Sequence, residues 1–150
     1  MADPTRKGFR LARVLELRER QVEVARDRLQ QREEELETVR AQRQELLGRG
    51  GELAVAATVA GDGAQSGAAF RFQERGRVWL EHRLQELDQR IEQCERNVAE
   101  ARRALQEAEQ ERRKLDTLRE RHAEAQRREA RKQERKRMNR FGAGNGGASQ

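Results

Sequence analysis

Hydrophobic residues recur along two stretches of the chain at spacings that alternate between three and four residues. The first stretch runs from Leu11 to Leu46 and visits eleven positions, eight of which are apolar. The second runs from Leu80 to Leu115 and also visits eleven positions, ten of which are apolar. A repeat of about 3.5 residues keeps one stripe of a helix facing a partner helix over many turns. The two stretches, called the seams below, therefore predict two long helices that pack along matching apolar stripes.

The segment between the two seams is rich in glycine. Residues 48–69 hold six of the twelve glycines, and glycine favours helix ends and loops. We therefore expect an all-α fold in which two long helices form an antiparallel coiled-coil hairpin with an overhanging basic C-terminal helix. The predicted segments are a polar lead at 1–8, helix one at 9–47, a loop at 48–69, helix two at 70–139 and a disordered tail at 140–150.

A register follows from the two seams. Pairing residues whose numbers add to about 130 sets large side chains against small ones, as with Leu36 and Cys94. It also sets Arg18 against Arg112, whose long stems can bend out of the seam. Helix two then extends past the start of helix one by roughly 20 residues, or about 30 Å. A register shifted by one heptad remains an alternative at this point.

The composition excludes a thick-cored globular enzyme. Only 34% of the residues are hydrophobic and 40% are charged, which suits one narrow seam between two helices. The two histidines, His82 and His122, lie forty residues apart, and the glycines at 61–67 lack the Lys-Ser/Thr of a phosphate-binding loop. We therefore predict that the protein is not an enzyme and needs no cofactor or metal.

The single cysteine and the chain's N-terminus bear on location. Cys94 lies on the second seam, so a buried reduced thiol is expected, as is usual in the cytoplasm. The first residues lack an apolar signal segment, and the longest run of low polarity, 53–60, is far shorter than the roughly 20 residues that span a bilayer. We expect a cytoplasmic protein that does not cross a membrane by itself.

The basic excess lies near the C-terminus. Residues 119–140 contain ten Lys or Arg and four acidic residues, which accounts for the whole net charge of +6. Such a segment suits an acidic partner, a membrane surface or nucleic acid. The alternative is a solvated helix face that binds nothing.

Aromatic residues gather at the predicted start of helix two. Phe70, Phe72 and Trp79 lie within ten residues of one another in a chain with only five aromatic residues. They either cover the loop end of the hairpin or form a docking face, because aromatic side chains are favoured anchors in interfaces.

Both ends of the chain resemble one family. The sequence Phe9-Arg-Leu-Ala-Arg-Val-Leu-Glu-Leu-Arg-Glu-Arg20 is similar to the opening of FliJ flagellar export proteins, and residues 115–121 and 129–136 resemble their closing stretch. Two features depart from the family's pattern. Met138-Asn139-Arg140 stands where the family often has an acidic pair, and the glycine-rich loop is longer than usual.

The resemblance implies a stalk component of the flagellar type III export apparatus, active in flagellum assembly and motility. Its implied partners are the hexameric export ATPase, the export-gate protein FlhA and export chaperones, with peripheral association at the cytoplasmic side of the cell membrane and no binding of nucleic acid. The implied gate-contacting positions are Phe72, Trp79, Arg83 and Leu87. The expected contacts with the ATPase ring are basic residues of the overhang, namely Arg127, Arg128, Arg131, Lys132, Arg135 and Lys136.

Three other functions fit parts of the same pattern. The chain would serve equally as the matching stalk of a virulence-type secretion system. A coiled-coil protein that binds nucleic acid would show salt-dependent binding to DNA. A self-associating scaffold would use the same seams.

Overall fold

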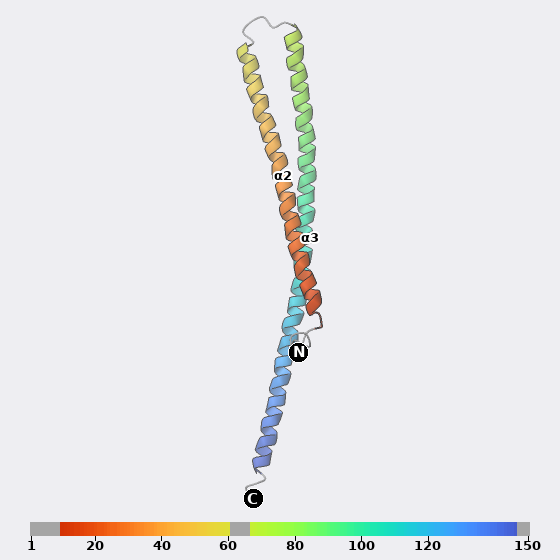
Figure 1. The fold of residues 1–150 in the computed structure, drawn as a ribbon, viewed down its shortest axis with the longest axis vertical. Helices are drawn as coiled ribbons and strands as arrows, with labels where there is room; N and C mark the ends of the chain where they lie inside the picture. Colours follow the sequence, from red (N-terminus) through yellow and green to blue (C-terminus); the bar gives the residue numbers. More distant parts are fainter. Residues whose placement is uncertain (1–9, 61–66, 147–150) are drawn as a thin grey trace. The chain divides into compact units, whose positions relative to one another are not determined.

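The computed structural model describes residues 10–60 and 67–146, nearly all of which are helical. Helix α2 spans Ala12–Ala60 and helix α3 spans Gly67–Gly146, and no strand occurs in these two ranges (Figure 1). The prediction of an all-α fold in which two long helices pack against each other is therefore confirmed. The contacts divide the helices into two compact units. Unit 1 combines α2 up to Glu23 with α3 from Gln106 onward, and unit 2 comprises Val24–Leu105.

Burial in both units follows the predicted seams. All seven buried hydrophobic side chains occupy seam positions: Leu15, Val22, Leu36, Val39, Leu87, Val98 and Ala101. Fourteen of the other fifteen seam residues are half-buried, and Leu11 is 37% exposed. Most residues off the seams are exposed. The seam prediction is therefore confirmed residue by residue, because a 3.5-residue repeat leaves only one stripe of each helix in contact with its partner.

Cross-helix contacts fix the register of unit 2. Gly50 and Leu80, whose numbers add to 130, lie so close that a Cβ atom on Gly50 would stand 2.6 Å from Leu80 Cδ2. At the edge of the seam, Arg43 Nε donates to Asp88 Oδ1 at 2.6 Å. The ion pairs Arg40–Glu95 at 3.4 Å and Arg102–Glu33 at 3.6 Å also join the two helices. These contacts agree with the predicted register and with antiparallel helices.

Unit 1 has a thinner core, which includes two arginines. Leu15 and Val22 are buried, while Arg18 and Arg112 occupy seam positions and are half-buried. Arg18 Nη1 donates to Gln21 Oε1 at 3.0 Å, and Arg112 Nε donates to Asp116 Oδ2 at 3.5 Å. Arg18 Nε is buried and has no hydrogen-bond partner among the described residues. A buried donor without a partner destabilises a fold by about 1–3 kcal/mol, so this seam position weakens unit 1.

The helix bounds differ from the predicted ones on the loop side. Helix α2 does not end at residue 47 but continues through Gly48, Gly50 and Gly51 to Ala60. None of the described glycines has a positive φ, so these three follow the helical backbone. Each glycine costs a helix about 1 kcal/mol relative to alanine. Two features offset this cost: Gly50 lets Leu80 approach closely, and residues 52–60 are mostly alanine and other helix-compatible residues.

Helix α3 is also longer than predicted at both ends. It begins at Gly67 rather than at residue 70 and ends at Gly146 rather than at residue 139. The predicted lead at 1–8, the first residue of predicted helix one, the centre of the predicted loop at 61–66 and the end of the predicted tail at 147–150 lie outside the described residues. Neither described helix contains a stretch apolar enough to span a membrane.

Candidate partner-binding site

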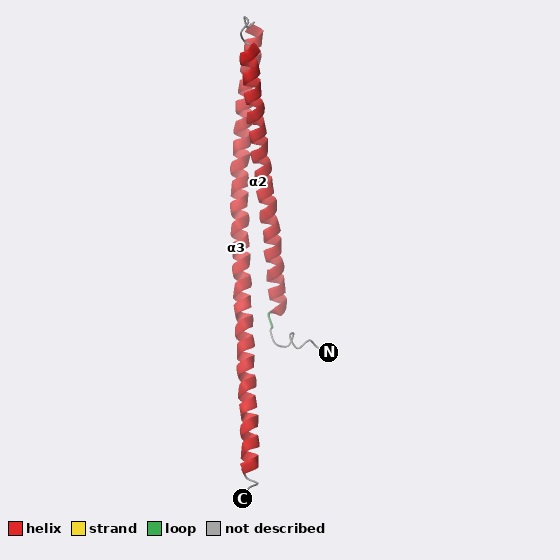
Figure 2. Ribbon diagram, turned by 90° about the vertical axis from the view of Figure 1, so that its left-hand side faces the viewer, coloured by secondary structure: helices red, strands yellow, loops and turns green. Residues whose placement is uncertain are grey.

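Two exposed parts of α3 carry the predicted partner-binding residues. The first, called the aromatic segment, comprises residues 67–83 and belongs to unit 2. The second, called the basic segment, comprises residues 119–143 and belongs to unit 1. Figure 2, turned by 90° from Figure 1, shows that both segments are continuous helix.

Large apolar side chains are exposed along the aromatic segment. The exposed fractions are 60% for Phe70, 80% for Phe72, 55% for Val78 and 62% for Trp79. On the facing part of α2, Leu53 is 72% exposed as well. None of the side chains that the structure describes at 47–54 and 67–83 is buried. The aromatic residues therefore do not close the loop end as a core, and a group of exposed apolar side chains of this kind is typical of an interaction site.

A shallow groove runs along one face of the aromatic segment. Phe70, Val78 and Trp79 supply its apolar lining, and the polar lining consists of Arg71, Glu74, Arg75 and His82. Successive residues of a helix are about 100° apart, so Val78 points roughly opposite to the seam residue two positions later. The groove is therefore on the outer face of α3. Val78 was not among the predicted partner-binding residues, although its spacing of eight residues from Phe70 places both on one side of the helix.

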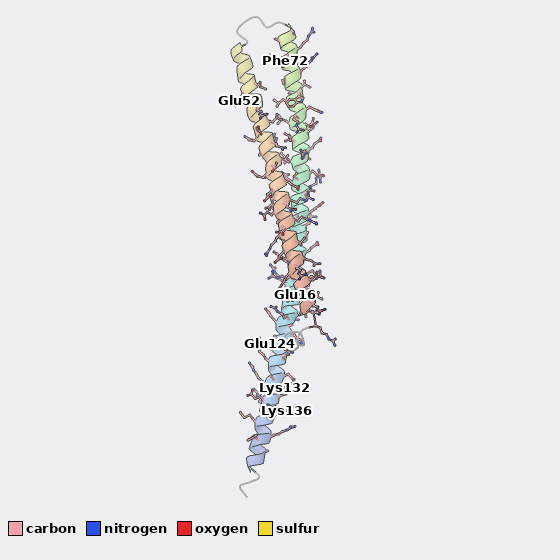
Figure 3. The ribbon with its side chains drawn as sticks, in the orientation of Figure 1. Glu16, Glu52, Phe72, Glu124, Lys132 and Lys136 are labelled. Carbon is pink, nitrogen blue, oxygen red and sulfur yellow. The ribbon has the colours of Figure 1, made fainter. Side chains whose placement is uncertain are left out.

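The four residues expected to contact the export gate are not equivalent. Phe72 and Trp79 are both exposed, and their spacing of seven residues places them on one side of α3. Figure 3 labels Phe72. Arg83 is half-buried, and its Nη1 donates to Glu86 Oε2 at 2.9 Å. Leu87 is 1% exposed and packs in the seam. The structure thus places Leu87 in the core of unit 2. Its side chain holds α3 against α2 and is not available to a partner.

The basic segment is a helix against which no described residue of α2 packs beyond Ala123. Ala123 is half-buried, and every residue from Glu124 to Ala143 is exposed. Figure 3 labels Glu16 on α2, and Lys132 and Lys136 farther along α3, where α3 is the only helix drawn. All six residues expected to contact the ATPase lie in this exposed stretch: Arg127, Arg128, Arg131, Lys132, Arg135 and Lys136.

Most of the positive charge in the basic segment has no acidic partner among the residues that the structure describes. Arg128 Nη2 donates to Glu124 Oε1 at 2.7 Å, and this contact, with the charges of Arg128 and Arg127, lowers the pKa of Glu124. No carboxylate among the described residues pairs with Arg131, Lys132, Arg135 or Lys136. A run of free cations therefore follows the Glu124–Arg128 pair on its C-terminal side.

Local ion pairs also hold side chains of the aromatic segment. Arg77 Nη2 donates to Glu74 Oε1 at 2.6 Å and Arg77 Nη1 lies 3.6 Å from Glu81 Oε1. The hydrogen bond that Arg77 donates to Glu74, followed by the charges of Glu74 and Glu81, raises the pKa of Arg77. Arg77 does not line the groove, whose arginines are Arg71 and Arg75.

The remaining candidates for chemistry are ordinary surface or seam residues. Cys94 is a free, half-buried thiol on the seam, less enclosed than predicted. His82 Nε2 lies 3.5 Å from Glu86 Oε1, and His82 is exposed. In residues 10–60 and 67–146, no group of His, Cys, Asp and Glu side chains is arranged to hold a metal ion.

The family comparison fits this arrangement of two seams and two exposed segments. The family described as the flagellar FliJ protein matches residues 6–139, which cover both seams and most of both segments. This chain belongs to the FliJ family. No curated protein and no solved structure matches it. FliJ-family membership confirms the resemblance found at the two ends of the sequence and identifies a non-catalytic component of flagellar protein export.

Proposed function

We propose that this FliJ-family protein is a stalk that couples the hexameric export ATPase to the export gate FlhA and so aids flagellum assembly. The basic segment contacts the ATPase ring, and the aromatic segment contacts the gate and serves export chaperones. The observation that carries the proposal is the exposed, unneutralised basic helix of unit 1. The protein acts without enzymatic activity, at the cytoplasmic side of the cell membrane.

The shape and charge of the basic segment suit the centre of a ring. A single α-helix with its side chains is about 10–12 Å wide, which is narrow enough to enter the opening of a hexamer. Cations around this helix favour an acidic lining and speed the encounter of the two proteins. The helix is already formed, so less ordering entropy is lost on binding than for a disordered tail.

The aromatic segment suits a different kind of contact. Phe72 and Trp79 present large apolar surfaces beside the half-buried Arg83. Buried aromatic side chains ringed by polar groups supply much of the binding energy in protein interfaces. We therefore assign FlhA to this segment. Leu87 contributes indirectly, because its packing in the seam holds α3 in place.

The first experiment measures the turnover of the purified export ATPase with and without this protein. We expect stimulation by the full chain and none by a chain truncated after Leu118, which retains both seams. The reversal R131E/K132E/R135E/K136E should also abolish stimulation while preserving helicity on circular dichroism.

A matched control distinguishes the effect of reversing charges in the basic segment from the effect of changing the net charge of the protein. The variant R20E/R28E/R103E/R113E reverses four exposed arginines outside the basic segment and changes the net charge by the same amount. It should stimulate like the natural protein. If the truncated chain or the reversed basic segment still stimulates turnover, the proposed ATPase contact is wrong.

A further inference from the structure

The basic segment ends in an exposed apolar pair. Met138 is 71% exposed and Phe141 is 78% exposed. They stand three residues apart, so their side chains are neighbours on the helix surface. The only other apolar side chains between residues 124 and 143 are those of alanines. An ATPase contact based on charge does not explain why two large apolar side chains are exposed here.

The apolar pair shares one face with cations. The step of four, three, four and three residues from Arg127 leads through Arg131 and Glu134 to Met138 and Phe141, which is the spacing of a single helical stripe. Arg131, Glu134 and Met138 also line one shallow depression. The stripe therefore combines two arginines with two large apolar side chains and a single acid, Glu134.

We propose that this face binds the surface of an anionic lipid bilayer. Lys and Arg near such a surface are attracted by its negative potential, and Met138 and Phe141 would insert at the boundary between headgroups and acyl chains. The long arginine stems let their guanidinium groups reach the headgroups while the apolar pair is buried. Glu134 opposes the attraction but is outnumbered by the cations around it.

The apolar pair favours a lipid surface over nucleic acid. Phosphate groups of DNA or RNA would attract the same cations, but that attraction gives Met138 no role. This inference does not depend on the proposed ATPase contact. A helix in a ring opening cannot lie on a bilayer, so the two partners compete for one copy of the protein.

The test is sedimentation of the full chain with lipid vesicles. We compare phosphatidylcholine alone with vesicles that also contain about a quarter phosphatidylglycerol, a typical anionic lipid. Binding should require the anionic lipid and should weaken at least about tenfold when salt rises from about 0.05 to about 0.2 M, because the surface attraction is screened. Equal binding to both vesicle types, or no binding to either, would overturn the proposal.

Substitutions separate the apolar contribution from charge. M138S/F141S keeps every charge, and it should weaken vesicle binding about tenfold through lost apolar burial. The matched control L17S/V24S removes two exposed apolar residues of α2 and should bind vesicles normally. If M138S/F141S binds vesicles like the natural protein, or if both variants weaken equally, the assigned face is wrong. If the natural protein binds anionic vesicles but does not stimulate the ATPase, that result contradicts the proposed function and leaves the lipid proposal standing.

A fluorescence measurement places the contact. The chain has one tryptophan, so F141W in a W79F background reports on position 141 alone. Its emission should shift to shorter wavelength with the anionic vesicles and stay unchanged with phosphatidylcholine alone. An unchanged emission with both would overturn insertion. Tight binding to duplex DNA that M138S/F141S retains, together with no binding to anionic vesicles, would assign the segment to nucleic acid instead.

Discussion

The aromatic and basic segments both expose one side or more of α3, yet they differ in every other respect. The aromatic segment has four large apolar side chains that are more than half exposed, and its Arg77 is held by two acids. The basic segment has a row of cations without acidic partners among the described residues, and its large apolar residues are confined to one end. Two stretches of the same helix thus present opposite chemistry.

This difference indicates two modes of binding. Apolar burial is strong, short-ranged and nearly independent of salt, so it suits a fixed contact. Unpaired cations act over about a Debye length and are screened by salt, so they suit steering and reversible engagement. One end of a helix can hold a partner while the other engages a second partner and releases it.

The largest expected effect is on stability, and it distinguishes a buried residue of the seam from an exposed residue of the aromatic segment. Leu87→Asp buries a carboxylate in the seam and should destabilise unit 2 by about 4 kcal/mol. Phe72→Asp, at an 80% exposed position, should leave the stability within about 0.5 kcal/mol. Urea unfolding followed by circular dichroism measures both. Equal stabilities for the two variants would mean that Leu87 is not in the core.

The next largest expected effect is on binding to FlhA, which should depend on salt less than binding to the ATPase does. Trp79→Ala should weaken binding to FlhA by about 2 kcal/mol, or about 30-fold, because it removes a large aromatic anchor. The natural protein's affinity for FlhA should change less than about threefold between low and physiological salt, whereas its affinity for the ATPase should fall at least about tenfold. Isothermal titration at two salt concentrations measures both partners. If FlhA binding is the more salt-sensitive of the two, the assignment of chemistry to segments is reversed.

Much of the fold was readable from spacing alone. Seam positions such as Val22 and Val98 are buried as the repeat predicts, because the alternation of three and four residues is a property of helix geometry. The end of α2 was not readable. Glycines normally mark helix ends, but the contact of Gly50 with Leu80 comes from the other helix and is invisible to local rules.

The candidate site was readable in part for the same reason. Composition located the basic segment, since charge density needs no tertiary information. The four expected gate positions were harder. Phe72, Trp79, Arg83 and Leu87 follow a helical spacing that drifts from the flank of α3 into its seam, and only the packing of unit 2 distinguishes the exposed Trp79 from the buried Leu87. The spacing of eight residues between Phe70 and Val78, which places both on the groove face, can be read from the sequence, but Val78 was not among the predicted residues.

A smaller effect concerns the glycines of unit 2. Gly48, Gly51 and Gly76 lie in or near the loop end of unit 2, and a Cβ atom at each would meet open space. Replacing any one by alanine should raise stability by about 0.5–1 kcal/mol through helix propensity. Gly50→Ala should gain less or lose stability, because its Cβ would displace the Leu80 side chain. Thermal unfolding of the four variants tests this, and a gain for Gly50→Ala equal to the others would refute the close contact.

The smallest expected effect is the pH dependence of helicity in the basic segment. An ion pair within this helix supplies stability that packing against α2 does not. Arg128 lowers the pKa of Glu124 from its usual value of 4.5, so the pair stabilises the helix above the unfolded pKa and this contribution is lost as pH falls through the lowered folded value. Helicity of the segment should therefore decline slightly below about pH 4.5. Nuclear magnetic resonance titration of the Glu124 carboxylate measures the shift directly. In Arg128→Gln the pKa of Glu124 should rise toward its usual value, with only the weaker influence of Arg127 remaining. A titration that is the same in both proteins would show that Arg128 is not the cause, and the segment would then lack even this local support.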